Sequence, residues 1–147
     1  MDQNHQRIIV SGVLLNQAGE VFLTKRPLTK TIAPGKYHLP GGHVDFGEAP
    51  EEALIREFAE EFRLSVKPVR IIRVFSYVYD TNHTVGITYA VEVQEIPENI
   101  WFDTNDNEAV GWVDENDYVT YLGVADHDAV TLAAFFKKGE SLETGTP

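Results

Sequence analysis

Apolar and polar positions along the chain follow two different periods, and this predicts interleaved strands and helices. Apolar, β-branched runs bounded by turn residues predict strands at 8–15, 21–25, 37–39, 70–79, 84–93 and 110–113. The turn residues at 16–19 predict that the first two strands form a hairpin, and the polar residues at 80–83 predict a second hairpin. The segments 27–36 and 97–108 are expected to be loops.

The clearest helix is predicted at 50–62. Pro50 suits the first helical position, and Glu51 and Glu52 complement the positive end of the helix dipole. A last helix is expected from a cap at Asp126 to about residue 138, and Asp114 is expected to cap a brief helical turn. The fold class is therefore α/β or α+β, with helices packed on a mixed sheet.

Length and composition indicate one globular domain. The 147 residues predict a single domain spanning 1–147, with loose termini at about 1–6 and 140–147. The formal net charge of −11 argues against binding to a nucleic-acid polymer. No apolar run is long enough to span a membrane, and the first six residues do not resemble a signal peptide. Together with the absence of cysteine, this favours a cytoplasmic location.

Acidic residues concentrate on the predicted helix. Glu57, Glu60 and Glu61 share one arc of it, about 100° wide at ~100° per residue. The neighbouring apolar arc, which should face the core, consists of Leu54, Ile55, Phe58 and Phe62. The alternative is a solvated acidic face, but such a face would lie far from the apolar arc. Three carboxylates at the edge of a core instead predict a site for Mg²⁺, a hard cation that prefers oxygen ligands.

The segment before the helix supplies further candidate ligands. Gly41 and Gly42 allow the backbone to approach a ligand closely, and a free carbonyl at Gly41 could complete a metal shell. Four basic residues lie just upstream, at positions 25, 26, 30 and 36, and Arg26 is the preferred phosphate contact among them. The alternative for each of these basic residues is an ordinary surface charge.

These residues resemble the Nudix box of the Nudix (MutT-like) hydrolase family. The matching positions are Gly42, Glu48 and the run 56–64, Arg-Glu-Phe-Ala-Glu-Glu-Phe-Arg-Leu. The resemblance implies an α/β/α sandwich and a Mg²⁺-dependent hydrolase of nucleoside diphosphates linked to another group. Two positions depart from the pattern. Arg63 stands where the pattern has its last glycine, and Ala49 stands where a Ser or Thr helix cap is preferred.

The resemblance also implies a role for each site residue. Glu57, Glu60, Glu61 and the carbonyl of Gly41 are expected to hold Mg²⁺, with Mn²⁺ as a substitute. The catalytic base is Glu57 or the loop residue Glu108, and the sequence does not decide between them. Arg56 and Glu48 are expected to orient the ligand glutamates.

Residues outside the box bear on the substrate. Phe75, Tyr77 and Tyr79 alternate onto one face of a strand, where Phe75 and Tyr77 are candidates for binding the nucleoside and core packing is the alternative. His43, His83 and His127 lack ligand spacing and are expected to be surface or loop residues.

Comparison with the family's substrate markers favours a nucleoside triphosphate that is cleaved to the monophosphate and pyrophosphate. The alternatives are hydrolysis of a sugar nucleotide or another nucleoside diphosphate derivative, and a non-catalytic module that senses nucleotides. The expected partner is the small nucleotide, and a homodimer remains open.

Overall fold

Two β-sheets form the centre of the molecule. The structure, a computed structural model, describes residues 4–123 and 125–145, with the side chains of 4–123 and 125–137. The first sheet has the strand order β4 (Gly41–His43), β1 (His5–Leu14), β6 (Asn82–Val93) and β5 (Val66–Tyr79). The second sheet has the order β3 (Tyr37–His38), β2 (Val21–Lys25) and β7 (Ala109–Val113).

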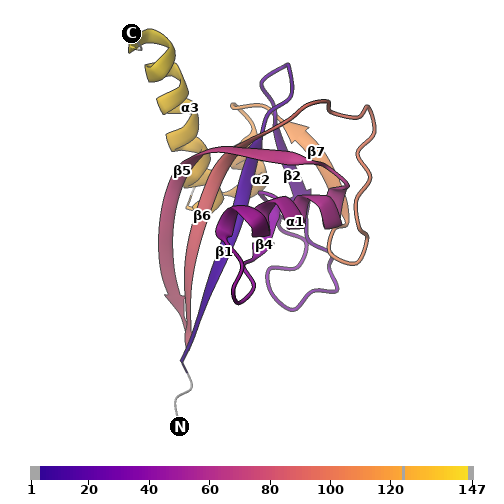
Figure 1. Cartoon of the computed structure of the whole chain (residues 1–147), viewed down its shortest axis with the longest axis vertical. Coiled ribbons are helices and arrows are strands. Elements are labelled where there is room, and N and C mark those ends of the chain that lie inside the picture. The colour runs from indigo at the N-terminus through magenta and orange to yellow at the C-terminus, as the bar shows by residue number, and fades with distance from the viewer. Residues whose placement is uncertain (1–3, 124, 146–147) are drawn as a thin grey trace.

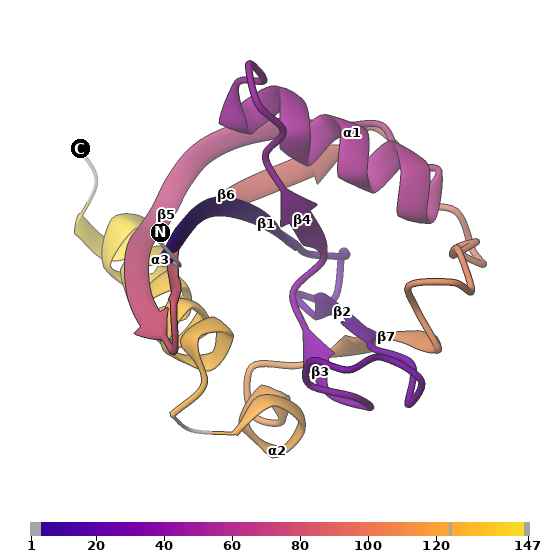
Figure 2. The same cartoon turned by 90° about the horizontal axis from the view of Figure 1, so that it is seen from below.

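Helices cover both sides of these sheets. They are α1 (Pro50–Phe62), α2 (Tyr118–Leu122) and α3 (His127–Gly145). The long strands of the first sheet and α1 dominate Figure 1. Figure 2 shows α1 on one side of this curved sheet, and α3, α2 and the second sheet on the other. Strand β1 is parallel to β6 and antiparallel to β4, so the expected mixed sheet is confirmed.

The two predicted hairpins have different outcomes. Strands β5 and β6 pair antiparallel over their whole lengths, as expected. The prediction that β1 and β2 form a hairpin is wrong, because the two strands belong to different sheets and meet only at a bridge between Leu15 and Val21. Strand β1 instead uses both of its edges inside the first sheet, for β4 and β6. The turn residues predicted the change of direction but not the change of partner.

Helix α1 has the predicted bounds. The backbone N–H of Ala49 donates to Glu52 Oε1 at 3.0 Å, and the helix ends at Arg63, whose φ of 53° is left-handed. Its buried apolar residues are Ala53, Leu54, Phe58 and Phe62. The expectation that Ile55 faces the core is wrong, since this residue is 41% exposed. At ~100° per residue the buried arc is centred near Leu54, which leaves Ile55 at its far edge.

Two apolar clusters fill the space between the layers. One lies under α1 and includes Val10, Phe22 and Tyr89, and the other lies under α2 and α3 and includes Val13 and Leu23. The second sheet therefore contributes alternate residues to both clusters.

Helix α3 begins as predicted, because Asp126 Oδ1 accepts a hydrogen bond from the N–H of Asp128 at 2.8 Å. The helix continues to Gly145, beyond the predicted end, so residues 140–145 are helical rather than loose. At the other terminus β1 begins at His5, and residues 1–3 and 146–147 lie outside the described part of the chain. No helix among the described residues is both long and apolar enough to cross a membrane.

Candidate active site

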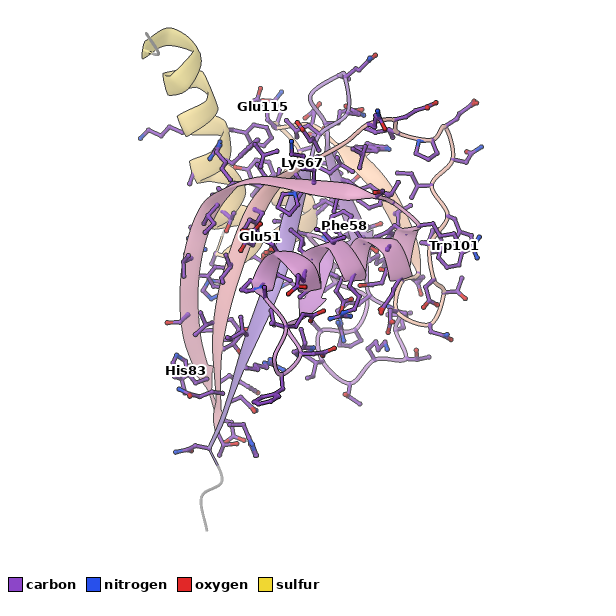
Figure 3. The ribbon with its side chains drawn as sticks, viewed as in Figure 1. Glu51, Phe58, Lys67, His83, Trp101 and Glu115 are labelled. Atoms are coloured by element: carbon purple, nitrogen blue, oxygen red, sulfur yellow. The ribbon has the colours of Figure 1, made fainter. Side chains whose placement is uncertain are left out.

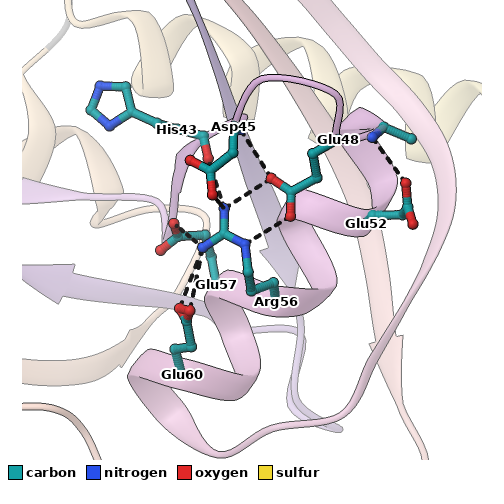
Figure 4. A network of polar contacts seen from close by, with 8 residues as sticks. His43, Asp45, Glu48, Glu52, Arg56, Glu57 and Glu60 are labelled. Carbon is teal, nitrogen blue, oxygen red and sulfur yellow. Dashed lines mark hydrogen bonds and ion pairs between the residues drawn. The ribbon is translucent and has the colours of Figure 1, made fainter.

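The Arg56 guanidinium links the loop before α1 to the acidic face of the helix (Figure 4). Its Nε and Nη2 donate to the two carboxylate oxygens of Glu48 at 2.8 and 3.0 Å, and Nη2 also donates to the carbonyl of His43 at 3.0 Å. Its Nη1 donates to Glu57 at 3.0 Å and to Glu60 at 3.3 Å. These contacts lower the pKa of Glu48 to about 2 and raise the pKa of Arg56.

Glu57 and Glu61 form a partly buried pair at the centre of this face. The two carboxyl groups lie close enough to interact electrostatically. Burial, and then the neighbouring Glu57, raise the pKa of Glu61. Glu60 is the outer member of the set, with its side chain 56% exposed.

The donor set fits a hard cation by its chemistry, because it consists of carboxylate oxygens. Among the described residues, no three acidic or histidine side chains stand close enough to hold a metal ion as they lie. Two of the expected ligands, Glu57 and Glu60, are instead bound to the cationic Arg56. Arg56 therefore neutralises part of the charge that a metal ion would neutralise.

Gly41 and Gly42 let β4 pass close to its neighbours. A Cβ on Gly42 would lie 2.4 Å from Cδ of Glu57, and one on Gly41 would lie 1.9 Å from the carbonyl oxygen of Val10. At Gly41 the neighbouring atoms are backbone, so no side chain fits there, and a side chain at Gly42 would displace the Glu57 carboxyl group. The two glycines thus bring the backbone against the acidic pair, and whether Gly42 also touches substrate remains a prediction.

A cavity of about 290 Å³ is bordered by β4. Its wall includes two predicted strand aromatics, the predicted phosphate contact and both glycines: Phe75, Tyr77, Arg26, Gly41 and Gly42. Arg26 Nε donates to the carbonyl of Ile32 at 2.8 Å, which holds the guanidinium at the cavity. A larger hollow of about 660 Å³ is lined by residues 15–18 and 93–96, away from the glutamates, and Glu95 is its one ionisable lining residue among those described.

Phe75 and Tyr77 stack on His127 at the start of α3. The ring centroids of His127 lie 4.7 Å from Phe75 and 4.9 Å from Tyr77, with interplanar angles of 12° and 17°. His127 is half-buried at the surface and is the first residue of α3, so the expected loop position is wrong but the expected surface position is not. Tyr79, grouped with these aromatics by its spacing, is 77% exposed. His43 is exposed, and the ring of His83 pairs with Gln6.

The polar end of the cavity was not predicted. The Nδ1–H of His38 donates to the carbonyl of Leu39 at 2.8 Å, and the N–H of Leu39 donates to Asp128 Oδ2 at 3.0 Å. Burial lowers the pKa of His38 and raises the pKa of Asp128 to about 6. His38 Nε2 is buried without a hydrogen-bond partner in the described part of the chain. No sequence motif marks either residue.

Two neighbouring loop residues, Asn107 and Glu108, make side-chain contacts that the sequence did not predict. The carboxylate of Glu108, a candidate base, forms an ion pair with Lys25 at 3.0 Å, and this contact raises the pKa of Lys25. Asn107, which sequence reasoning missed, is buried and donates from Nδ2 to Glu61 Oε1 at 3.2 Å. An asparagine in a polar loop carries no signal that distinguishes it from its exposed neighbours.

Comparisons with known proteins agree with this architecture. The family model for the NUDIX domain matches residues 5–135. The 8-oxo-dGTP diphosphatase of Escherichia coli (strain K12) is 31% identical over 84 residues, which are 57% of this chain and 64% of that protein. The chain thus aligns with less than two thirds of the length of that relative.

An RNA pyrophosphohydrolase of Vibrio cholerae is 36% identical over 72 residues, which are 49% of this chain and 39% of that protein. Among solved structures, a MutT protein from Methanosarcina mazei Go1 has a TM-score of 0.81 at 19% identity and covers 94% of this chain and 98% of that one. At this level of identity the structural similarity establishes the fold.

Proposed function

The chain belongs to the NUDIX domain family, and from this premise we propose that it is a Mg²⁺-dependent pyrophosphohydrolase that cleaves a nucleoside triphosphate to the monophosphate and pyrophosphate. The observation that carries the proposal is the acidic face of α1, where the Glu57 carboxyl group lies against Gly42 in the wall of a nucleoside-sized cavity and Arg56 bonds to Glu48, Glu57 and Glu60. The absence of cysteine is compatible with a cytoplasmic enzyme.

Glu57, Glu60, Glu61 and the carbonyl of Gly41 are the proposed Mg²⁺ ligands. Bound there, Mg²⁺ would neutralise phosphate charge and make a coordinated water more acidic. A protein with a net charge of −11 needs such a cation to bind a polyanion. When Glu57 and Glu60 engage the metal, Arg56 keeps its two bonds to Glu48 and so continues to hold the loop against the helix.

We assign removal of the proton from the attacking water to Glu57. Its carboxyl group lies against Gly42 in the cavity wall. Glu57 and Glu108 are each ion-paired at 3.0 Å, to Arg56 and to Lys25, so the position beside the cavity wall, and not the ion pair, distinguishes Glu57. A general base must come within hydrogen-bonding reach of the proton that it takes, and Glu57 meets this condition more directly. Arg26, at the same cavity, is placed to contact the phosphates.

The nucleoside would occupy the cavity, with its base against Phe75 and Tyr77 and its polar edge towards His38 and Asp128. Because the Leu39 carbonyl can only accept, Nδ1 of His38 carries the proton and Nε2 is an acceptor. An ionised Asp128 is also an acceptor. Two acceptors at the same cavity favour a base with adjacent N–H donors, as on the ring N–H and amino edge of guanine. The relative from Escherichia coli is named for a guanine nucleotide.

A product-resolved substrate screen tests this function. GTP, dGTP, the other nucleoside triphosphates, ADP-ribose, a dinucleoside polyphosphate and a sugar nucleotide are each incubated with Mg²⁺ and with EDTA. Monophosphate and pyrophosphate should form in the Mg²⁺ reactions, fastest with guanine nucleotides. A tenfold preference for ADP-ribose or the sugar nucleotide would contradict the proposed substrate class. Nucleotide binding without turnover in any reaction would instead support the sensing module.

A further inference from the structure

The loop between β6 and β7, residues 94–108, is attached to the C-terminal end of α1. The guanidinium carbon of Arg63 lies 3.8 Å from the ring centroid of Trp101. The backbone N–H of Asp103 donates to the carbonyl of Glu61 at 2.8 Å. Figure 3 shows Trp101 beside this end of the helix. Arg63, the departure from the Nudix box, therefore anchors a loop at the position where the pattern has a glycine.

Asn107 lies at the inner end of this loop and is 1% exposed. Its Nδ2 donates to Glu61 Oε1 at 3.2 Å and to the carbonyl of Asp103 at 3.1 Å. Its Oδ1 accepts a hydrogen bond from the hydroxyl of Thr24 in β2. A carbonyl oxygen cannot donate, so the contact with Asp103 fixes which side-chain atom is the nitrogen. Both N–H groups and the oxygen of the amide are therefore engaged.

This arrangement restricts the Glu61 side chain from one side. Asn107 is tied to the second sheet through Thr24 and to its own loop through Asp103, so its amide has little freedom to turn. The oxygen Oε1 of Glu61 is thus held by a fixed donor. Groups of this kind, which bond to a metal ligand without touching the metal, commonly set the affinity of the site.

We propose that Asn107 is a positioning residue that orients the Glu61 carboxylate for Mg²⁺, an inference that rests on the proposed metal-binding role of Glu61. Asn107 touches neither metal nor substrate in this role. The β6–β7 loop, fastened by Trp101 and Arg63, carries Asn107 to the helix. The opposing interpretation is that Asn107 only closes its own loop, through the bond to Asp103.

Metal binding by the full chain, measured by titration calorimetry with MgCl₂ alone, separates the two interpretations. Asn107→Leu keeps a similar side-chain size and removes the donor to Glu61. The Kd for Mg²⁺ should rise by about tenfold or more. The matched control is Asn105→Leu, a change at an exposed asparagine of the same loop, and its Kd should stay within about twofold of the parent. In a Glu61→Gln background, Asn107→Leu should change the residual Mg²⁺ binding no further.

Thr24→Val provides a second variant in case Asn107→Leu does not fold. It removes only the hydroxyl that donates to Asn107, and the Kd for Mg²⁺ should rise by about threefold. In both variants excess Mg²⁺ should restore kcat, and the KM for nucleotide should not change. A merely structural role would lower the melting temperature and leave the Kd for Mg²⁺ unchanged, which would overturn the proposal. If the parent chain itself bound no Mg²⁺, the proposed function would fail as well. Failure of the Asn107 proposal alone would instead show as Mg²⁺ binding that is the same in the parent and the variants.

Discussion

Asp128→Asn is expected to stabilise the protein near neutral pH. Burial raises the pKa of Asp128 to about 6, from 3.8 for an unperturbed carboxyl group. This difference of roughly 2.2 pH units corresponds to about 3 kcal/mol at ~1.4 kcal/mol per unit. Asparagine cannot ionise, and its amide oxygen can still accept the hydrogen bond from the N–H of Leu39. The variant should therefore gain up to about 3 kcal/mol in the free energy of unfolding at pH 7.

The direction in which stability changes with pH follows from how tightly each state binds the Asp128 proton. The native state binds the Asp128 proton more tightly than the unfolded chain does, so the contribution of this group to stability is complete below pH 3.8 and is lost as the pH rises through about 6. Urea unfolding of parent and variant in parallel, at four pH values from 4 to 7, isolates this contribution, because the other titrating groups are common to both proteins. The difference in free energy should be small at pH 4 and largest at pH 7. A difference that does not change with pH would refute the reasoning.

Three further substitutions test individual contacts around the acidic face. Gly42→Ala should lower activity by at least about 100-fold with little loss of secondary structure in circular dichroism, because its Cβ would displace the Glu57 carboxyl group; activity equal to that of the parent would contradict this steric argument. Arg56→Lys should lower the free energy of unfolding by about 1–2 kcal/mol and activity by tenfold or more, because one ammonium group cannot replace the fork of hydrogen bonds; urea unfolding and initial rates measure both, and a neutral result would show that the network does not matter. Arg63→Gly should change stability by less than about 1 kcal/mol in the same unfolding assay, because relief of the left-handed strain offsets the loss of the contact with Trp101; a loss of several kcal/mol would assign the loop anchor a much larger role.

Local signals in the sequence were sufficient for the elements that carry the acidic face. Helix α1 was predicted with its observed ends, since Pro50, the acidic first turn and the apolar spacing all favour the same element. The box residues Arg56 and Glu48 were predicted to orient the ligand glutamates. They share two hydrogen bonds, and Arg56 also donates to Glu57, while their orienting role stays a prediction. The burial of Ile55 was predicted wrongly, because the centre of the buried arc depends on the tertiary surface under the helix.

Contacts between distant segments were not available from the sequence. His127 and Phe75 are 52 positions apart, and their stacking depends on how α3 packs against β5. The sequence also gave no reason to join Asn107 to Glu61, because neither spacing nor residue type marks an isolated amide as a partner. The same limit applies to β1. The turn residues that follow it predict a hairpin, although its hydrogen-bond partners are β4 and β6.

The most direct test of the proposed function combines turnover of GTP and thermal melts, each with and without Mg²⁺, for the parent and Glu61→Gln. Glutamine keeps the size of the glutamate side chain and removes its charge, which relieves repulsion among the neighbouring carboxylates, so the metal-free variant should melt at the same temperature as the parent or slightly higher. Mg²⁺ should stabilise the parent by about 2.7 kcal/mol at 100 times its Kd and should stabilise the variant far less. Activity of the variant should fall by at least about 100-fold. Equal activities, with equally small effects of Mg²⁺ on the two melting temperatures, would contradict the assignment of Glu61 as a metal ligand.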